Sequence, residues 1–171
     1  MTFVGNAILT AAQLNTHLRD NLLETAPAKA TTEGGYFVAS GPNAIVERVA
    51  QVKRANGLVS TSSTSFVPLS GGPAVTATTS TTALVFHGCR LENTGTGASL
   101  QSWAVSGATT RAALLATTIL LEGISANNFC IMSDVDLMTG LTPGVNTFTC
   151  QYRAGSGTAS FQSRFIAVMP L

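Results

Sequence analysis

The hydrophobic and polar positions of this chain follow two different periods. Within residues 10–26, Leu14, Leu18 and Leu22 recur every four residues and form one narrow apolar stripe, as in an amphipathic helix. From about residue 58 onward, apolar and polar residues alternate in short segments that are separated by turn residues. The pattern therefore predicts a short N-terminal helix in front of a β-rich region.

The predicted helix has start and stop signals. Thr10 followed three residues later by Gln13 forms a capping box, and Leu9 and Leu14 have the spacing of a hydrophobic staple. Pro27 ends the helix, because a proline forces the residue before it out of helical backbone. A helix of about four turns with a single leucine stripe is marginal alone in water. We therefore expect the stripe to pack on another surface.

A connecting arm follows the helix. Two short strand-like segments flank the turn sequence Gly41-Pro42-Asn43. The expected organisation is an anchoring helix and extended arm over residues 1–57 and a β-sandwich domain over residues 58–171. The side chains that we expect to anchor the chain to a particle, or to other copies, are Leu14, Leu18, Leu22, Tyr36, Phe37 and Ile45.

The β-region predicts about eight strands with local turns and no alternation of strand and helix. The expected fold class is mainly β, an antiparallel β-sandwich or jelly-roll-like domain. Ser65–Leu69 is one expected strand, and Leu100–Ser106 is another, with Trp103 and Val105 on one face. Residues 113–121 could be strand or helix, since periodicity does not separate the two. The last strand ends within two residues of the C-terminus, so we expect it to be tied into a sheet.

The chain is unusually poor in charge. Only 10% of its residues are charged, against about 25% in typical soluble domains. Such a surface is a poor monomer surface, so we expect an oligomer. A net charge of +1 argues against nucleic acid as the main partner. No apolar segment approaches the ~20 residues of a membrane span, and no basic residue precedes the first apolar ones as in a secretory signal. We expect a soluble product made in the cytosol.

Three cysteines, Cys89, Cys130 and Cys150, lie in apolar strand-like segments. Their odd number and wide spacing fit neither a disulfide framework nor a zinc site. Buried free thiols are the expected state, and a bridge between Cys130 and Cys150 on neighbouring strands is the alternative.

The candidate chemistry is sparse. His87 lies inside an apolar segment, which favours a satisfied core or interface histidine over a base or ligand. Asp134 and Asp136 share one face of a strand and could hold Ca²⁺ with loop carbonyls, but a solvent-facing strand edge explains them better. Nucleophile-elbow, phosphate-loop and dinucleotide motifs are absent. We therefore expect no enzyme, no cofactor and no metal site. The apolar residues on the other face of the acidic strand are Phe129, Ile131, Val135 and Leu137.

The N-terminal sequence resembles that of a known protein family. Residues 6–32, NAILTAAQLNTHLRDNLLETAPAKATT, and residues 34–49, GGYFVASGPNAIVERV, resemble the start of a group of small tailed-bacteriophage virion surface proteins. In that group a similar helix and arm precede a β-domain rich in Ser and Thr. Residues 141–171 are also similar to the group's ending.

The resemblance implies a homotrimeric virion component that is assembled in the host cytoplasm. Its partners would be copies of itself and other virion proteins, such as the major capsid or tail proteins. Head decoration, head-fibre, tail-fibre and minor tail proteins all belong to the group, so head and tail locations both stay open. A structural role on the particle surface is our first interpretation.

Two alternatives remain. The β-domain could be a receptor-binding tip of a tail fibre that recognises a host-surface glycan or protein, or the chain could be a non-viral trimeric jelly roll. Sugar-binding tips usually expose aromatic residues on loops, whereas Trp103 is in mid-strand and the loops are rich in Gly, Ser and Thr. This difference favours the structural role.

Overall fold

A computed structural model describes residues 10–23, 29–123 and 126–171 of the chain. The chain divides into two compact units, of which the first ends at Val49 and the second spans Ala50–Leu171. The sequence-based boundary lay after residue 57. The structure assigns residues 51–55 to the second unit because they form a strand that pairs with the last strand of the β-domain.

The first unit contains a helix, α1 (Ala11–Leu23). The predicted capping box is confirmed, since the Thr10 amide donates to Gln13 Oε1 at 3.0 Å and the Gln13 amide donates to Thr10 Oγ1 at 3.2 Å. These bonds satisfy backbone groups that the first helical turn leaves open. Leu9 and Pro27, the predicted staple and stop residues, lie outside the described residues.

The same unit contains an antiparallel hairpin of β1 (Tyr36–Gly41) and β2 (Ala44–Arg48). Pro42 and Asn43 make the turn, as the sequence predicted. Asn43 has a φ of 55°, a left-handed conformation that asparagine tolerates better than most residues.

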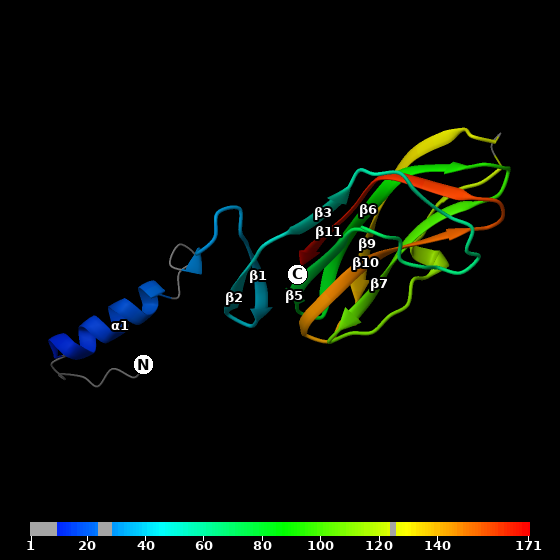
Figure 1. The fold of residues 1–171 in the computed structure, drawn as a ribbon. Helices are drawn as coiled ribbons and strands as arrows, with labels where there is room; N and C mark the ends of the chain where they lie inside the picture. The colour runs from blue at the N-terminus through cyan, green and yellow to red at the C-terminus, as the bar shows by residue number, and fades with distance from the viewer. Residues whose placement is uncertain (1–9, 24–28, 124–125) are drawn as a thin grey trace. The chain divides into compact units, whose positions relative to one another are not determined.

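The second unit is an antiparallel β-sandwich with a jelly-roll-like fold, as the sequence predicted (Figure 1). One sheet has the order β3-β11-β6-β9, with β4 pairing beside another part of β11. Its strands are β3 (Gln51–Ala55), β4 (Val59–Thr61), β6 (Thr82–Asn93), β9 (Phe129–Thr139) and β11 (Ala159–Pro170). The other sheet has the order β5-β10-β7-β8. Its strands are β5 (Ala74–Thr79), β7 (Ser99–Gly107), β8 (Ile119–Leu121) and β10 (Gly144–Ala154).

The core lies between the two sheets and is built by period-two alternation. In β10 every second residue is buried, and Trp103 and Val105 of β7 face the same interior, as predicted. Trp103 packs against Phe148 with ring centroids 5.9 Å apart, and Tyr152 packs against Phe161 at 4.8 Å. Pairs of tilted rings at such distances add to the free energy gained by burying their area.

Two local expectations change. Ser65–Leu69 is not a strand, because Val67 makes only an isolated bridge to Tyr152. Residues 113–121 contain both a 3-10 helix (Leu115–Thr117) and the short strand β8. Nine strands, β3–β11, are present in the described part of the second unit, slightly more than expected.

The C-terminal end is tied into the sheet, as predicted. Figure 1 shows β11 in red between β3 and β6. Its residues pair with β3, β4 and β6, and the amide of Leu171 donates to the carbonyl of Thr82 at 3.0 Å.

Candidate interaction surfaces

The helix of the first unit displays its leucine stripe. Leu14, Leu18 and Leu22 are 46%, 53% and 65% exposed. Three large apolar side chains in a row on a surface helix favour contact with a further apolar surface. We therefore expect a partner of the first unit to cover this leucine stripe.

The hairpin divides the three expected arm contacts between its two faces. Directly paired residues share a face, and Ala39 pairs with Ile45 while Val38 pairs with Val46. Phe37, which is 37% exposed, therefore shares a face with Ile45. Tyr36 lies on the opposite face, and both Tyr36 and Ile45 are half-buried. A single flat contact would engage one of these faces only.

Glu47 fastens the loop before the hairpin to strand β2. Its carboxylate accepts hydrogen bonds from the amides of Thr31 and Thr32, both at 2.9 Å, and from the hydroxyl of Thr31. The Thr31 hydroxyl and these two amides lower the pKa of Glu47, since they stabilise its charged form. A Cβ at Gly35 would lie 2.3 Å from Glu47 Oε1, so a side chain there would force this carboxylate to move.

The second unit has a strongly apolar outer surface on the β3-β11-β6-β9 sheet. Residues that pair across strands share a face, and Val135, Phe86 and Ala167 form one such row, which Val52 continues on β3. We call this surface the apolar face. Its apolar residues are Val52, Leu84, Phe86, Val135, Leu137, Phe165, Ala167 and Met169, and the guanidinium of Arg54 lies on the same side, 5.1 Å from the centre of the Phe165 ring.

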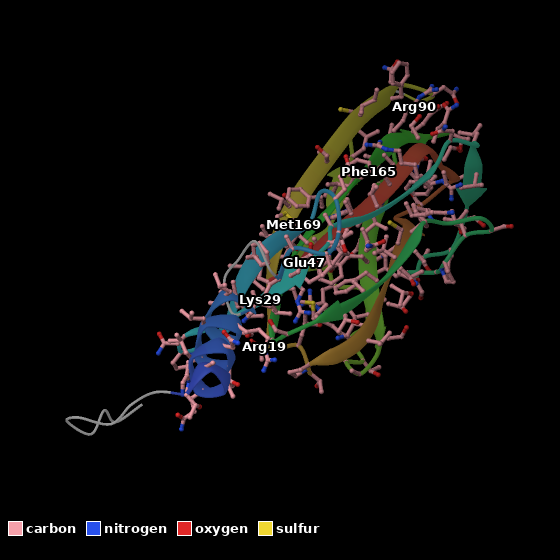
Figure 2. All side chains as sticks on the ribbon, turned by 90° about the vertical axis from the view of Figure 1, so that its left-hand side faces the viewer. Arg19, Lys29, Glu47, Arg90, Phe165 and Met169 are labelled. Carbon is pink, nitrogen blue, oxygen red and sulfur yellow. The ribbon has the colours of Figure 1, made fainter. Side chains whose placement is uncertain are left out.

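Much of the apolar face is open to solvent in the single chain. Val52, Val135 and Leu137 are 59%, 50% and 56% exposed. Figure 2 shows Met169 and Phe165 in succession along the sheet, with Arg90 beyond them. At that end polar and apolar side chains mix: Arg90 donates to Gln162 and pairs with Glu92 at 3.0 Å, and its guanidinium lies 4.0 Å from the centre of the outward-facing Phe129 ring.

The outer surface of the other sheet has a different character, and we call it the polar face. The hydroxyls of Thr76 and Thr147 hydrogen-bond across β5 and β10 at 2.9 Å. Thr and Ser side chains suit a strand surface that stays in water. The outward residues of this face include Thr76, Thr78, Ser106, Thr147, Thr149 and Gln151. Val145, which is 57% exposed, also points outward on this sheet, but its Thr, Ser and Gln side chains make this side more polar than the apolar face.

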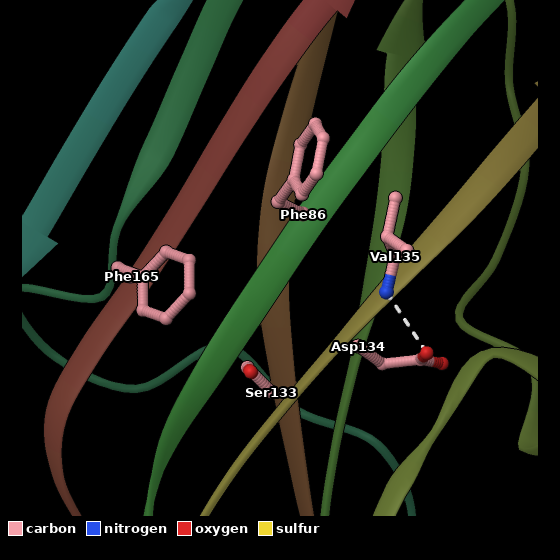
Figure 3. Close-up of a pocket in the computed structure, with 5 residues that line it drawn as sticks. All are labelled: Phe86, Ser133, Asp134, Val135 and Phe165. Carbon is pink, nitrogen blue, oxygen red and sulfur yellow. Dashed lines mark hydrogen bonds between the residues drawn. The ribbon is translucent and has the colours of Figure 1, made fainter.

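A hollow of about 250 Å³ lies within the apolar face (Figure 3). Phe86 and Phe165 form its apolar walls, and Ser133, Asp134 and Val135 line its other side. It exists because Gly88 carries no side chain: a Cβ there would lie 2.6 Å from the Phe165 ring.

The edge strands of this sheet carry opposite charges. At β9, Asp134 and Asp136 point to the inner side of the sheet, while the apolar residues of β9 point outward; Ile131 is 73% exposed. Asp136 Oδ2 lies 3.9 Å from Arg111 Nη2, and this ion pair is weak because both side chains are partly exposed to solvent. We call this edge the β9 rim. At the opposite edge, the β3 rim, Lys53 is exposed.

His87 is fully buried, as expected, but the expectation of a satisfied histidine was wrong. Neither Nδ1 nor Nε2 has a hydrogen-bond partner among the residues that the structure describes. Burial lowers the pKa of His87, although the nearby carboxylates of Asp134 and Asp136 act in the opposite direction. The imidazole is therefore held in its neutral form.

Arg164 is a buried cation that the sequence analysis missed. It is 2% exposed and lies at a bulge in β11, where Ser163 has a φ of 51°. Its Nη2 donates to the Gly57 carbonyl at 3.5 Å, and the guanidinium lies 5.7 Å from the centre of the Tyr152 ring. The apolar alternation of the last strand changes parity between Phe161 and Ile166, which marks the bulge. Nothing local in the sequence marks the burial of the arginine.

All three cysteines are free, as expected, and the alternative bridge is not formed; Cys89 and Cys150 are buried as predicted, but Cys130 is only half-buried. Cys130 lies on β9 of one sheet and Cys150 on β10 of the other. Burial raises the pKa of Cys150 to about 11 and also raises that of Cys89. Both thiols therefore stay protonated at neutral pH and are poor nucleophiles.

Two further findings concern chemistry and membranes. Across residues 10–23, 29–123 and 126–171, no group of three or more His, Cys, Asp or Glu side chains could hold a metal ion. Within the same residues, no helix has both the length and the apolar character that crossing a membrane requires.

Comparisons with known proteins agree with the fold. No family model and no curated protein matches the chain. It is similar to the structure of Eiger TNF from S. frugiperda, with 14% identity, a TM-score of 0.51, and coverage of 72% of this chain and 92% of that one. At this identity the likeness shows the fold alone, a jelly-roll-like β-sandwich.

Two weaker likenesses involve other β-proteins. One is to the VP2 subviral particle of infectious bursal disease virus, with 11% identity and a TM-score of 0.44; it covers 78% of this chain but 37% of that one. The other is to the C-terminal CBM6 of LamC from Zobellia galactanivorans, with 12% identity, a TM-score of 0.32, and coverage of 70% and 99%. These scores carry no argument about function.

Proposed function

We propose that this chain is a non-catalytic structural protein of a tailed-phage virion, a homotrimeric component of the particle surface. In this proposal the β-domain self-associates through its apolar face. The N-terminal helix and hairpin attach the trimer to other virion proteins, such as the major capsid protein.

The observation that carries the proposal is the contrast between the two outer surfaces of the sandwich. Solvated sheets usually present polar residues outward, as the polar face does. The apolar face instead leaves Val52, Val135 and Leu137 at least half exposed in the single chain. Contiguous apolar surface of this kind marks interaction sites. A protein whose work is assembly needs such a surface, and the low charge of the chain supports the same interpretation.

The N-terminal segment supports attachment. Its leucine stripe is exposed on α1, and one face of the hairpin presents Phe37 and Ile45. The more specific part of the resemblance to phage virion proteins lies in this segment. We therefore propose that the helix and hairpin make the contact with the particle while the β-domain makes the contact between copies.

Copy number in purified particles tests the proposal. The chain would be quantified against the major capsid protein by mass spectrometry. Hundreds of copies would support head decoration or cement, with particle stability as the role. A handful of copies would move the proposal to a tail or fibre component whose β-domain recognises the host. Absence from particles would overturn the virion proposal.

The attachment step has its own test. Replacement of Leu14, Leu18 and Leu22 by serine is expected to abolish incorporation into particles while the β-domain stays folded. The matched control is A12S/T16S, because Ala12 and Thr16 are exposed on the opposite side of the same helix. Normal incorporation of the leucine variant would refute attachment through the stripe.

A further inference from the structure

We infer that three copies of the β-domain close into a ring, edge to edge, with the β9 rim of one copy against the β3 rim of the next and all apolar faces turned toward the ring axis. This inference rests on the proposed self-association and adds which parts of the copies meet.

The two rims are complementary in charge. The β9 rim carries Asp134 and Asp136 on the inner side of the sheet, and the β3 rim carries Lys53, which lies opposite the inward-facing Ile166. In the part of the chain that the structure describes, neither Asp134 nor Lys53 makes an ion pair. Because β3 and β9 are opposite ends of the strand order, the acidic rim of one molecule meets a basic rim only on another molecule.

Contact between like rims is disfavoured. Two β9 strands from different copies would bring aspartates against aspartates, and two β3 strands would bring Lys53 against Lys53. Like charges directly opposite each other destabilise paired strands. The arrangement that remains is head to tail, which generates either a closed ring or an open filament.

Strand direction also fits head-to-tail contact. Each neighbouring pair in β3-β11-β6-β9 is antiparallel, so β9 runs opposite to β3. When the next copy continues the sheet, its β3 strand is antiparallel to β9 of the first copy. The backbone N–H and C=O groups at the free edges of the two strands can then pair in an antiparallel ladder.

The thickness of the apolar layer selects three copies. Four strands spaced ~4.8 Å apart make a face roughly 19 Å wide. Three such faces form a triangle whose sides lie about 5.5 Å from the axis, close to half of the ~10 Å that separates two packed sheets. Four faces would lie roughly 9.5 Å from the axis and would leave an unfilled apolar channel. Two flat faces packed ~10 Å apart would leave their rims about twice the ~4.8 Å strand spacing apart, so direct pairing of the rims favours three copies over two.

A charge exchange at the rims tests the ring. The full-length chain, K53E, D134K and the double variant K53E/D134K would be compared by native mass spectrometry over a concentration series. Each single variant places like charges across every contact, so we expect the concentration at which the trimer half-dissociates to rise roughly tenfold or more. The double variant restores opposite charges and should return this concentration to the wild-type range. T78E and T78K, which place the same charges on the polar face, serve as controls.

The outcomes separate this inference from the proposed function. A monomeric wild-type chain would overturn self-association, and the ring with it. If the wild type is a trimer and K53E and D134K dissociate at the same concentration as the wild type, the rim contact alone would be overturned. A wild-type dimer, or a double variant that folds normally by circular dichroism but fails to reassemble, would also overturn the ring. Weakening by K53E and D134K with recovery in the double variant would support it.

Discussion

Replacing Val52, Val135 and Leu137 together by serine is expected to weaken self-association of the β-domain strongly without unfolding it. These three residues lie on the apolar face, on the two edge strands β3 and β9. They are 59%, 50% and 56% exposed in the single chain. Because about half of each side chain already meets water, its loss costs the single chain little.

The magnitude follows from the area that assembly would still cover. Fully burying a Val or Leu side chain contributes ~1.5–3 kcal/mol, so burying the exposed half contributes roughly 0.8–1.5 kcal/mol. Three such residues amount to about 2–4 kcal/mol per copy. A free-energy loss of that size weakens association roughly 30- to 1,000-fold.

Sedimentation equilibrium over a range of concentrations measures the association, and circular dichroism reports whether each variant is folded. V145S is the matched control, because Val145 is 57% exposed on β10 of the other sheet. It should associate like the wild type. If the triple variant sediments like the wild type at every concentration, the apolar face is not the contact between copies. If V145S dissociates as strongly, the effect is not specific to that face.

Three further predictions concern single residues. G88A is expected to destabilise the β-domain by about 1–3 kcal/mol in urea unfolding, because its Cβ would lie 2.7 Å from a backbone carbonyl as well as against Phe165; an unchanged midpoint would contradict the close contact. The wild-type melting temperature should fall as the pH drops from 7.5 to 5.5, because burial lowers the pKa of His87 below 6.5 and the unfolded chain then binds the extra proton; H87Q should lose most of this slope. The hydrogen bonds of Glu47 lower its pKa. The contribution of its carboxylate to the stability of the fold is therefore fully present above pH 4.5 and is lost as the pH falls through the lowered pKa. E47Q should therefore speed amide exchange of Thr31 and Thr32 at pH 6, and equal exchange rates in both proteins would refute the role of Glu47.

The sequence predicted features that depend on local spacing. The capping box at Thr10 and Gln13, the hairpin turn at Pro42-Asn43 and the buried pair Trp103 and Val105 all occur as expected. Each depends on residues within a few positions of one another, where backbone geometry and side-chain preference act directly.

Expectations failed where they depended on partners distant in sequence. Ser65–Leu69 has a strand-like composition but finds only one bridging partner. Residues 51–55 belong to the β-domain because β11, more than a hundred positions later, pairs with them. His87 was expected to be satisfied, but the groups around its ring come from other strands and supply no hydrogen bond within the described residues.

Local sequence patterns were enough to predict that the chain is mainly β, that a capped helix precedes the β-domain, and that Phe129, Ile131, Val135 and Leu137 oppose Asp134 and Asp136 on one strand. Alternation has a period of two in every strand, so it separates the two faces of a strand but does not say which face meets the core. That β9 is an edge strand whose apolar residues face outward follows from the folded sheet and not from the alternation. The order β3-β11-β6-β9 and the register between strands fix which side of the sheet each residue occupies.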